Sequence, residues 1–395
     1  MQVVAGSRAR RAVGGAIVAA AGLALAPSAL ANIYHPTKLN DDPKHGLTLR
    51  EAVTKANNRL GTDKIVLLGG KTYDLSIPNS AGDEDADATG DLDILDSLRI
   101  VSSNKKRATV DANAIDRVFE VGPASAASAS FRYVKIRGGK TSSGSGGGIE
   151  LDHGSLGLAK SAVSGNAGFN GGGIETSGPL TISKSTISGN SSAAGCCGGI
   201  YSNSGGAATI NRSTISGNFA DGCCGGIGTE GDLLSVTNST IAGNVTNGSG
   251  GGVNSGATLL NSVTVVRNRA EANDIGTGDG GGIYRFEGSF VVRNSIVALN
   301  TVGQGGGSPD CFGSFSSAGV NLLTSLSGCT GFGPPNILTS DPKLGSLKNN
   351  GGPTKTIALL KRSPAINHAG SGAPSRDQRG VKRGKHPDIG AYEKF

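Results

Sequence analysis

The sequence predicts an all-β protein: a right-handed single-stranded parallel β-helix of about 26 residues per coil, with three short strands per coil and a short N-terminal capping helix. Two patterns predict it. A glycine cluster that ends in Ile or Val recurs six times, and its closing residues lie 25, 26, 27, 26 and 30 positions apart: Ile149, Ile174, Ile200, Ile227, Val253 and Ile283. A turn asparagine recurs at intervals of 24, 28, 26, 24 and 32: Asn166, Asn190, Asn218, Asn244, Asn268 and Asn300. Because both patterns share one period, stacked coils explain them better than chance.

Each coil is expected to contribute three strands, as at residues 173–175, 180–182 and 185–187, where apolar and polar residues alternate between Gly, Ser, Pro and Asn. Equivalent strands pair from coil to coil, so like side chains stack. Ile187, Ile215 and Ile241 are expected to form one apolar column. The six turn asparagines are expected to form an amide ladder.

Residues 1–31 have the features of a secretory signal peptide. Arg8, Arg10 and Arg11 precede an apolar run over residues 12–26, and Ala29-Leu30-Ala31 matches a cleavage site. A membrane anchor is the alternative, but the run of about 15 residues is shorter than the about 20 that a span needs. We therefore expect a secreted protein that begins at Asn32, and no later segment is apolar enough to span a membrane.

The charge balance argues against a nucleic-acid partner. The formal net charge is +7 and falls to +4 without the signal peptide, and the chain has no Trp and only 4% aromatic residues. Nucleic-acid-binding proteins concentrate cations and stacking aromatics on one face.

The segment before the regular repeats is expected to cap the solenoid. Thr48 and Glu51 form a capping-box pattern for a helix that runs through Asn57 and carries an apolar face. Such a helix would cover the open end of the first coil. The predicted organisation is a signal peptide at 1–31, a cap with first coils at 32–121, regular repeats at 122–307 and a proline-rich closing segment at 308–395.

Six cysteines in an exported chain indicate disulfides. Cys196-Cys197 and Cys223-Cys224 lie 27 residues apart, which is one coil, and the spacing of stacked strands permits bonds between them. Cys311 and Cys329 would then close a loop. The alternative is a zinc site made by the four adjacent cysteines, although their spacing lacks the usual C-x2-C form.

An acidic segment near the N-terminus is a candidate calcium site. Aspartates alternate with other residues around a glycine, and carboxylate oxygens are preferred Ca²⁺ ligands. The alternative is a solvated acidic loop. The candidate ligands are Asp83, Asp85, Asp87, Asp91 and Asp93.

The residue after each glycine cluster and its apolar partner is expected to point outward, and in two neighbouring coils it is Glu150 and Glu175. Two carboxylates about 5 Å apart form the catalytic pair of a retaining glycosidase. The alternative is two solvated surface side chains.

A second set of aligned positions carries the cations Lys160, Lys184 and Arg212 on successive coils. This strip would suit an acidic polysaccharide, or a lyase that uses a basic residue to remove a proton beside a uronate carboxylate. Solvated surface charge is the alternative.

Several motifs resemble a family of exported bacterial β-helix proteins. Residues 47–52, Leu-Thr-Leu-Arg-Glu-Ala, resemble its opening CSLREA motif, with Leu47 in place of the family's Cys. The closing segment resembles the choice-of-anchor Q domain at residues 341–345, 350–354, 363–366, 377–380 and 388–393. The resemblance implies a secreted or surface-displayed right-handed β-helix without a defined reaction. Because the sequence stops just after the last motif, we expect release or loose envelope association rather than covalent anchoring.

The sequence thus favours a secreted or surface-associated, monomeric module that binds polysaccharide or cell surfaces and acts in adhesion. The alternatives are a polysaccharide lyase or glycoside hydrolase that acts on acidic polysaccharide, and a passive structural scaffold of the envelope. No motif of a nucleophile elbow, a metalloprotease or a phosphate-binding loop is present.

Overall fold

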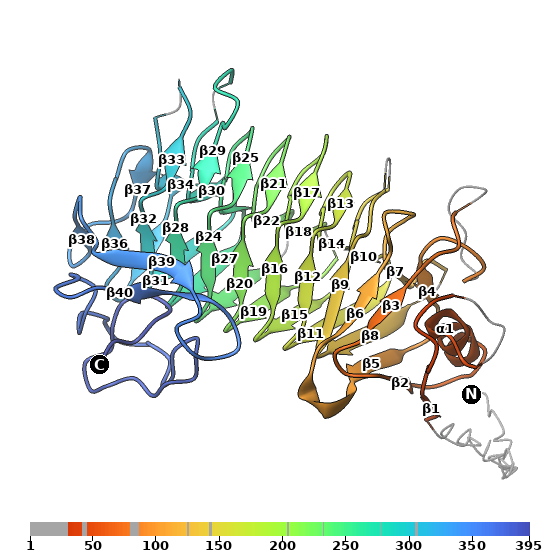
Figure 1. The fold of residues 1–395 in the computed structure, drawn as a ribbon. Coiled ribbons are helices and arrows are strands. Elements are labelled where there is room, and N and C mark those ends of the chain that lie inside the picture. Colours follow the sequence, from red (N-terminus) through yellow and green to blue (C-terminus); the bar gives the residue numbers. More distant parts are fainter. Residues whose placement is uncertain are drawn as a thin grey trace, which may run out of the picture.

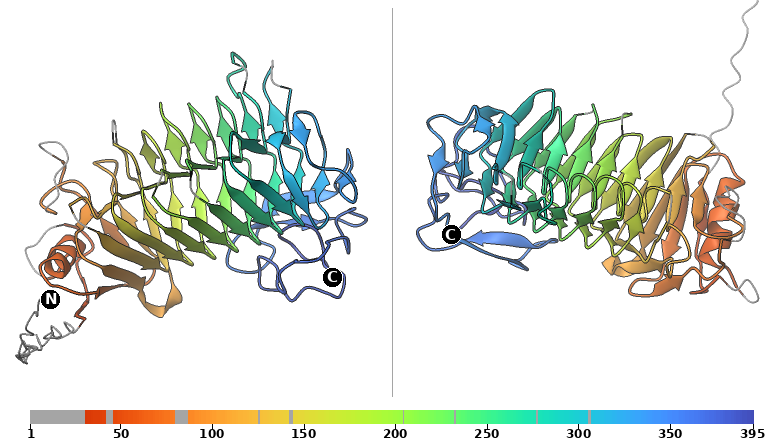
Figure 2. Two further views of the ribbon diagram at one scale, coloured as in Figure 1. Left: turned by 180° about the vertical axis from the view of Figure 1, so that it is seen from behind. Right: turned by 90° about the horizontal axis from the view of Figure 1, so that it is seen from above.

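The protein is a right-handed parallel β-helix, as predicted (Figures 1 and 2). The computed structural model describes residues 31–41, 46–79, 87–124, 126–141, 144–203, 205–231, 233–276, 278–304 and 307–395. Apart from Ala31, the predicted signal peptide lies outside these residues. Three long parallel sheets, which we call A, B and C, run along the axis, and each coil contributes one strand to each.

Sheet A contains β1 (Ile33–Tyr34), β2 (Asp63–Leu67), β5 (Leu98–Ser102), β8 (Ala127–Arg132), β11 (Gly154–Ala159), β15 (Leu180–Ser183), β19 (Ala208–Asn211), β23 (Leu234–Thr237), β27 (Thr258–Asn261), β31 (Phe290–Arg293) and β35 (Ser316–Ala318). Sheet B contains β3 (Thr72–Asp74), β6 (Ala108–Asp111), β9 (Val134–Arg137), β12 (Ala162–Ser164), β16 (Thr186–Ser188), β20 (Thr214–Ser216), β24 (Thr240–Ala242), β28 (Thr264–Val266), β32 (Ile296–Ala298), β36 (Leu322–Leu323) and β38 (Ile337–Leu338).

Sheet C contains β4 (Leu92–Ile94), β7 (Phe119–Val121), β10 (Ile149–Leu151), β14 (Ile174–Thr176), β18 (Ile200–Ser202), β22 (Ile227–Thr229), β26 (Val253–Ser255), β30 (Ile283–Arg285), β34 (Cys311–Ser314) and β37 (Cys329–Thr330). Six coils add a fourth, two-residue strand, which the sequence analysis did not predict because two residues are too few to show an alternating pattern. These strands form sheet D: β13 (Ala167–Gly168), β17 (Ser191–Ser192), β21 (Phe219–Ala220), β25 (Val245–Thr246), β29 (Arg269–Ala270) and β33 (Thr301–Val302).

The core consists of apolar columns that run along the axis. Ile187 pairs with Ile215, which pairs with Ile241, and all three are fully buried. The residues that end the glycine clusters form a second column in the same way. Stacking identical β-branched side chains fills the interior of every coil with the same shape, so the hydrophobic contacts repeat from coil to coil.

The asparagine ladder and the glycine clusters touch each other. Asn190 Nδ2 donates to Asn218 Oδ1 at 3.0 Å, and the same bond recurs between each successive pair in the ladder. A Cβ on Gly173 would lie 2.8 Å from Asn190 Nδ2 and 2.6 Å from the carbonyl oxygen of Gly199. The two sequence patterns share one period because, at each ladder asparagine, the neighbouring backbone comes so close that only glycine fits there.

The ladder ends on an aspartate that the sequence analysis did not identify. Asp310 Oδ1 accepts from Asn300 Nδ2 at 3.0 Å, and its Oδ2 accepts from the backbone N–H groups of Thr324 and Ser325. Burial raises the pKa of this carboxyl, although these hydrogen bonds oppose the shift.

The N-terminal coil is covered by α1 (Leu49–Asn57), with both bonds of the predicted capping box. Its apolar face is buried, as expected. The buried Arg50 side chain crosses to the acidic segment, where it donates to the carbonyl oxygens of Gly90 and Asp91 at 2.7 and 2.6 Å and pairs with Asp41 at 3.2 Å.

No helix in the described part of the chain is long and apolar enough to cross a membrane. A short 3-10 turn spans Ser103–Lys105.

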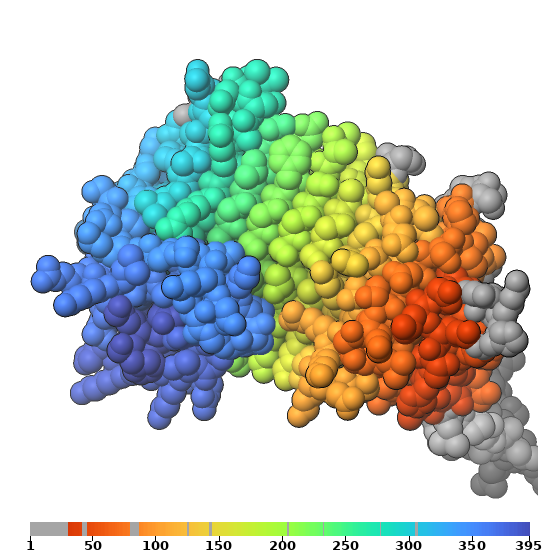
Figure 3. All heavy atoms as spheres, in the orientation of Figure 1, coloured from red at the N-terminus to blue at the C-terminus, as the bar shows by residue number. Residues whose placement is uncertain are grey.

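The coils continue beyond residue 307 to β38, and the rest of the chain folds back and packs on sheet B. Figure 3 shows this part of the chain, in blue, lying against earlier coils. This returning segment carries the antiparallel strands β39 (Leu344–Lys348) and β40 (Thr356–Leu359). Its Leu344, Ile357 and Ile389 form a second apolar core with Ile296 and Leu322 of the solenoid. The returning segment therefore covers the apolar outer face of the last coils.

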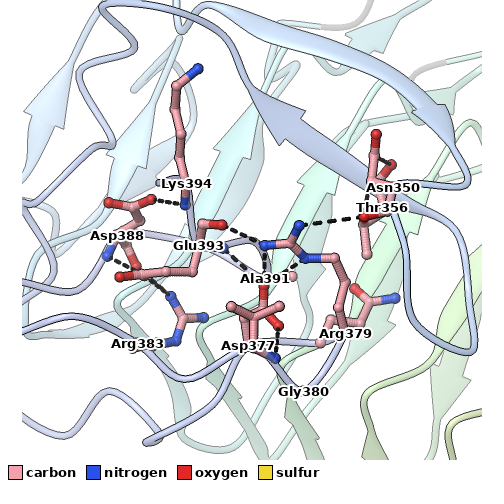
Figure 4. A network of polar contacts seen from close by, with 12 residues as sticks. Asn350, Thr356, Asp377, Arg379, Gly380, Arg383, Asp388, Ala391, Glu393 and Lys394 are labelled. Carbon is pink, nitrogen blue, oxygen red and sulfur yellow. Dashed lines mark hydrogen bonds and ion pairs between the residues drawn. The ribbon is translucent and has the colours of Figure 1, made fainter.

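The returning segment is held together by buried charges (Figure 4). Arg379 pairs with Asp377 at 2.7 Å, and Arg383 pairs with Glu393 at 3.1 Å. Asp388 accepts from the backbone N–H of Asn367 at 2.7 Å. The motifs of this segment thus have structural roles in the fold.

Candidate functional site

The outer face of sheet C carries one continuous column of aligned positions, most of which hold acidic or aromatic residues. The register places Glu150 beside Glu175 on the next coil, as the sequence analysis predicted. The column extends in both directions, and its members in order are Asp93, Glu120, Glu150, Glu175, Tyr201, Gly228, Asn254, Tyr284 and Phe312. It is acidic towards the N-terminal end and aromatic towards the C-terminal end.

Arg117 organises the acidic end of the column. Its guanidinium pairs with Asp91 at 3.0 Å, with Glu120 at 3.2 Å and with Glu150. The arginine is 3% exposed. A buried cation favours the ionised form of adjacent carboxylates, so Arg117 stabilises the negative charge on this group.

Glu175 lies in a different electrostatic environment. It is 8% exposed, and its Oε2 has no hydrogen-bond partner among the described residues. Burial, followed by the charges of Glu150 and Asp152, raises the pKa of Glu175 to about 7. The two glutamates therefore do not splay into water; one is ion-paired and the other is partly protonated near neutral pH.

The calcium prediction concerns residues that the structure describes only in part. Asp83 and Asp85 lie outside the described residues. Asp91 and Asp93 come close to Glu120, with one carboxylate oxygen from each within 4.8 Å of the others. Arg117 supplies positive charge to this cluster through Asp91 and Glu120.

The backbone N–H of Asp93 donates to Asp87 Oδ1 at 2.7 Å, and the backbone N–H of Asp87 donates to Asp93 Oδ2 at 3.0 Å. Burial and then the charge of Asp93 raise the pKa of Asp87 to about 7. Calcium binding by the predicted set stays a prediction.

All six cysteines form disulfides. Cys196 bonds Cys223 and Cys197 bonds Cys224 across neighbouring coils, with Cα distances of 4.7 and 4.6 Å. Cys311 bonds Cys329. No thiolate remains for the alternative zinc site.

The Cys197–Cys224 disulfide lies beside the column on the outer face of sheet C. A Cβ on Gly228 would lie 2.2 Å from Cys197 Sγ and 2.4 Å from Cys224 Sγ. The missing side chain at Gly228 therefore makes room for the sulfur atoms. Next to them lies Tyr201, whose hydroxyl bonds Glu230; burial and then that bond raise the pKa of Tyr201.

A groove of about 410 Å³ opens beside the disulfides on the same face. Tyr201, Tyr284 and Phe286 line it with aromatic surface, while Glu230 and Glu287 line it with carboxylates. Phe286 is 44% exposed. Tyr284 stacks on Phe312 of the next coil, with ring centroids 5.1 Å apart and planes 5° from parallel. Exposed aromatic faces with polar groups beside them are typical of ligand sites.

The predicted cation strip lies elsewhere. Lys160, Lys184 and Arg212 occupy the corner between sheets A and B, each with positive φ. Lys160 Nζ donates to the Tyr133 hydroxyl at 2.8 Å, and Arg212 Nε donates to the Gln378 carbonyl oxygen at 3.0 Å. The glutamates lie on sheet C and the cations at the corner between sheets A and B, so the two sets do not share a face.

Several residues of the sheet C face were not identified from the sequence. Glu120 follows an irregular coil without a glycine cluster, so no repeat pointed to it. Glu230 and Phe286 lie in turns outside the repeating positions.

Comparison with known proteins adds a fold likeness. The sequence matches no protein-family model and no curated protein significantly. The structure is similar to the crystal structure of pectate lyase Pel9A, with 15% sequence identity over 93% of this chain and 98% of that chain and a TM-score of 0.49.

Proposed function

We propose that this protein is an exported binding module that holds a neutral polysaccharide in the groove on the outer face of sheet C. The single observation that carries this proposal is the groove of about 410 Å³ in which Tyr201, Tyr284 and Phe286 meet Glu230 and Glu287. Sugar rings pack their C–H faces on aromatic rings, and carboxylates accept hydrogen bonds from sugar hydroxyls.

The charge of the face favours a neutral glycan over an acidic one. Glu230 and Glu287 line the groove, and no Lys or Arg lines it among the residues that the structure describes. An acidic polymer would meet like charge here, which costs affinity at short range. The disulfide-linked backbone beneath the groove is rigid, so little conformational entropy is lost when a ligand binds.

The test is binding of the secreted protein to an array of neutral and acidic glycans, followed by calorimetry on the strongest neutral ligand. We expect the double variant Tyr284→Ala/Phe286→Ala to bind at least about tenfold more weakly, since each exposed aromatic contributes on the order of 1 kcal/mol. Phe219→Ala is the matched control, because Phe219 is an exposed aromatic on sheet D, outside the groove. Equal affinity of wild type and double variant would refute the proposed site.

A second candidate function, glycoside hydrolysis, is favoured by the contrast between the two glutamates. Glu150 forms an ion pair with Arg117, whereas the pKa of Glu175 is raised to about 7, and two-carboxylate glycosidases use such a difference in environment to separate the roles of base and acid. The test is release of reducing ends from neutral polysaccharides by wild type and by Glu150→Gln/Glu175→Gln. Hydrolysis that survives the double substitution would exclude this pair.

A further inference from the structure

A second concave surface lies on the outer face of sheet A and has the opposite charge. Lys64 of β2 pairs in register with Arg99 of β5, and Arg132 of β8 stands beside Val101 in the neighbouring row. Figure 1 shows these strands side by side at the N-terminal end of sheet A. Arg99 and Arg132 are exposed. Three cations thus gather on three consecutive coils.

The cations border a groove of about 490 Å³ whose other lining groups are uncharged. Ser130, Thr181 and Ser183 contribute hydroxyls, and Gly157 leaves the middle of the row without a side chain. No carboxylate lines this groove among the described residues. An anion placed there would meet positive charge without a competing acid.

The groove continues across the sheet, toward the starts of the same strands, into a second hollow of about 310 Å³ that shares Arg99, Ser130 and Thr181 with it, and both hollows extend along the axis from the coil of β2 to that of β15. The continuation is lined by hydroxyls from successive coils. Ser155 Oγ donates to Ser128 Oγ at 2.9 Å, so these groups form a connected hydroxyl row. A trough with several hydroxyls per coil and charge at one end fits an extended polyhydroxylated chain better than a small anion.

The remaining charged groups near the trough leave Lys64 and Arg99 available, while the third cation, Arg132, lies 5.6 Å from the centroid of the Tyr133 ring. Arg107 Nε donates to the Lys160 carbonyl oxygen at 2.9 Å, and Lys160 Nζ is held by the Tyr133 hydroxyl. Asp96 accepts from the backbone N–H groups of Gly61 and Ser97. Within the described residues, neither Lys64 nor Arg99 has a side-chain ion pair or hydrogen bond.

We infer that the trough on sheet A is a binding site for a carboxylate-bearing polysaccharide laid along the axis of the β-helix. The carboxylates contact Arg99, Arg132 and Lys64, and the sugar hydroxyls contact the serine and threonine row. Arginine binds carboxylates through two parallel hydrogen bonds, which gives geometry as well as charge. This site is independent of the proposed groove on sheet C, which lies on another face and carries acids.

The test uses polygalacturonate, a uronate homopolymer, and its fully methyl-esterified form, which has the same sugars without the charge. Binding of each polymer is measured by affinity electrophoresis and by calorimetry at low salt. The test variant is Arg99→Gln/Arg132→Gln. The matched control, Lys361→Gln/Arg362→Gln, removes two exposed cations from the returning segment. Circular dichroism and thermal unfolding are used to check that both variants keep the fold.

We expect wild type to bind polygalacturonate, to bind the ester at least about tenfold more weakly, and to lose affinity as salt is added. The Arg99→Gln/Arg132→Gln variant should bind polygalacturonate at least about tenfold more weakly, because two charge-assisted contacts are lost. The control and Tyr284→Ala/Phe286→Ala should bind it as wild type does.

Three results would overturn the inference: no binding of polygalacturonate by wild type, equal binding of its ester, or equal losses in the test and control variants. The last result would show attraction by overall charge rather than a site. Because the sheet C variant is measured in the same experiment, failure of this site and failure of the proposed function are separated.

Discussion

Gln378 of the returning segment accepts a hydrogen bond from Thr240 of β24, with 2.7 Å between Oε1 and Oγ1. Its Nε2 lies 3.0 Å from Ser213 O, 3.0 Å from Thr214 Oγ1 and 2.9 Å from Thr354 Oγ1. The side chain is fully buried. One amide thus joins the returning segment to two coils more than 130 residues earlier in the chain.

The first prediction concerns this contact. Gln378→Leu keeps the approximate volume but leaves the buried hydroxyl of Thr240 and the carbonyl of Ser213 without their partner, so we expect a loss of about 2–4 kcal/mol in the free energy of unfolding. Urea denaturation measures the loss, and limited proteolysis shows release of the returning segment. Gln304→Leu, at an exposed position, is the control. Unchanged stability and proteolysis of Gln378→Leu would show that the apolar contacts alone hold the segment.

The sequence predicted the coils well because equivalent positions are buried in every coil and therefore carry similar residues. Ile187, Ile215 and Ile241 lie one period apart, so their stacking was visible without a structure. The contact between Gln378 and Thr240 was not, because it joins a segment that has lost the period to one that keeps it. Pairing between such segments depends on how the chain folds back, which no local pattern encodes.

The second prediction tests the asparagine ladder. Asn218 Nδ2 donates to Ile187 O at 3.2 Å and to Asn244 Oδ1 at 2.9 Å, and its Oδ1 accepts from the Asn190 N–H at 3.0 Å. Asn218→Ala removes these bonds from a buried site, and we expect a loss of about 2–4 kcal/mol in urea unfolding.

Asn211→Ala is the control for the ladder, because Asn211 is exposed on β19 of the same coil. Its substitution should change the free energy of unfolding by less than about 0.5 kcal/mol. Similar losses in the two variants would mean that the ladder bonds contribute no more than a surface amide.

The third prediction concerns the space that Gly228 leaves for sulfur. Because a Cβ there would lie 2.2 Å from Cys197 Sγ, we expect Gly228→Ala to displace the Cys197–Cys224 disulfide and to lower the melting temperature. Mass spectrometry after alkylation without reductant counts the free thiols, and calorimetry gives the melting temperature. Gly333→Ala is the control, because its Cβ would meet no atom within 4 Å. A variant with no free thiols and the wild-type melting temperature would contradict this account.

The sequence predicted which residues of the candidate site lie side by side, but it did not predict their burial or the charges around them. The repeat placed Glu150 beside Glu175, yet nothing local showed that Arg117 pairs with the first and that the second is buried. Those differences arise from Arg117, Asp152 and Glu230, which lie outside the repeating positions. Burial and neighbouring charge, rather than register, decide what each carboxyl does.

The last prediction follows from the burial of Glu175. The pKa of this carboxyl rises from 4.5 to about 7 on folding, so the folded state favours its neutral form. The stability that the neutral form provides is fully present below about pH 4.5 and is lost as the pH rises through 7. Glutamine has the shape of the protonated glutamate and stays neutral at every pH. The free energy of unfolding of Glu175→Gln should therefore rise relative to that of wild type over this range, by no more than about 3 kcal/mol above pH 8.

Urea unfolding of wild type and Glu175→Gln at several values between pH 4 and pH 8.5 measures this difference, and other titrating groups such as Asp87 cancel because both proteins contain them. Glu287→Gln, the same substitution at an exposed glutamate, is the control. A pH-independent difference for Glu175→Gln would mean that the carboxylate finds solvent or a cation in the folded protein. In that case the contrast with Glu150, and the hydrolytic role that depends on it, would lose its basis.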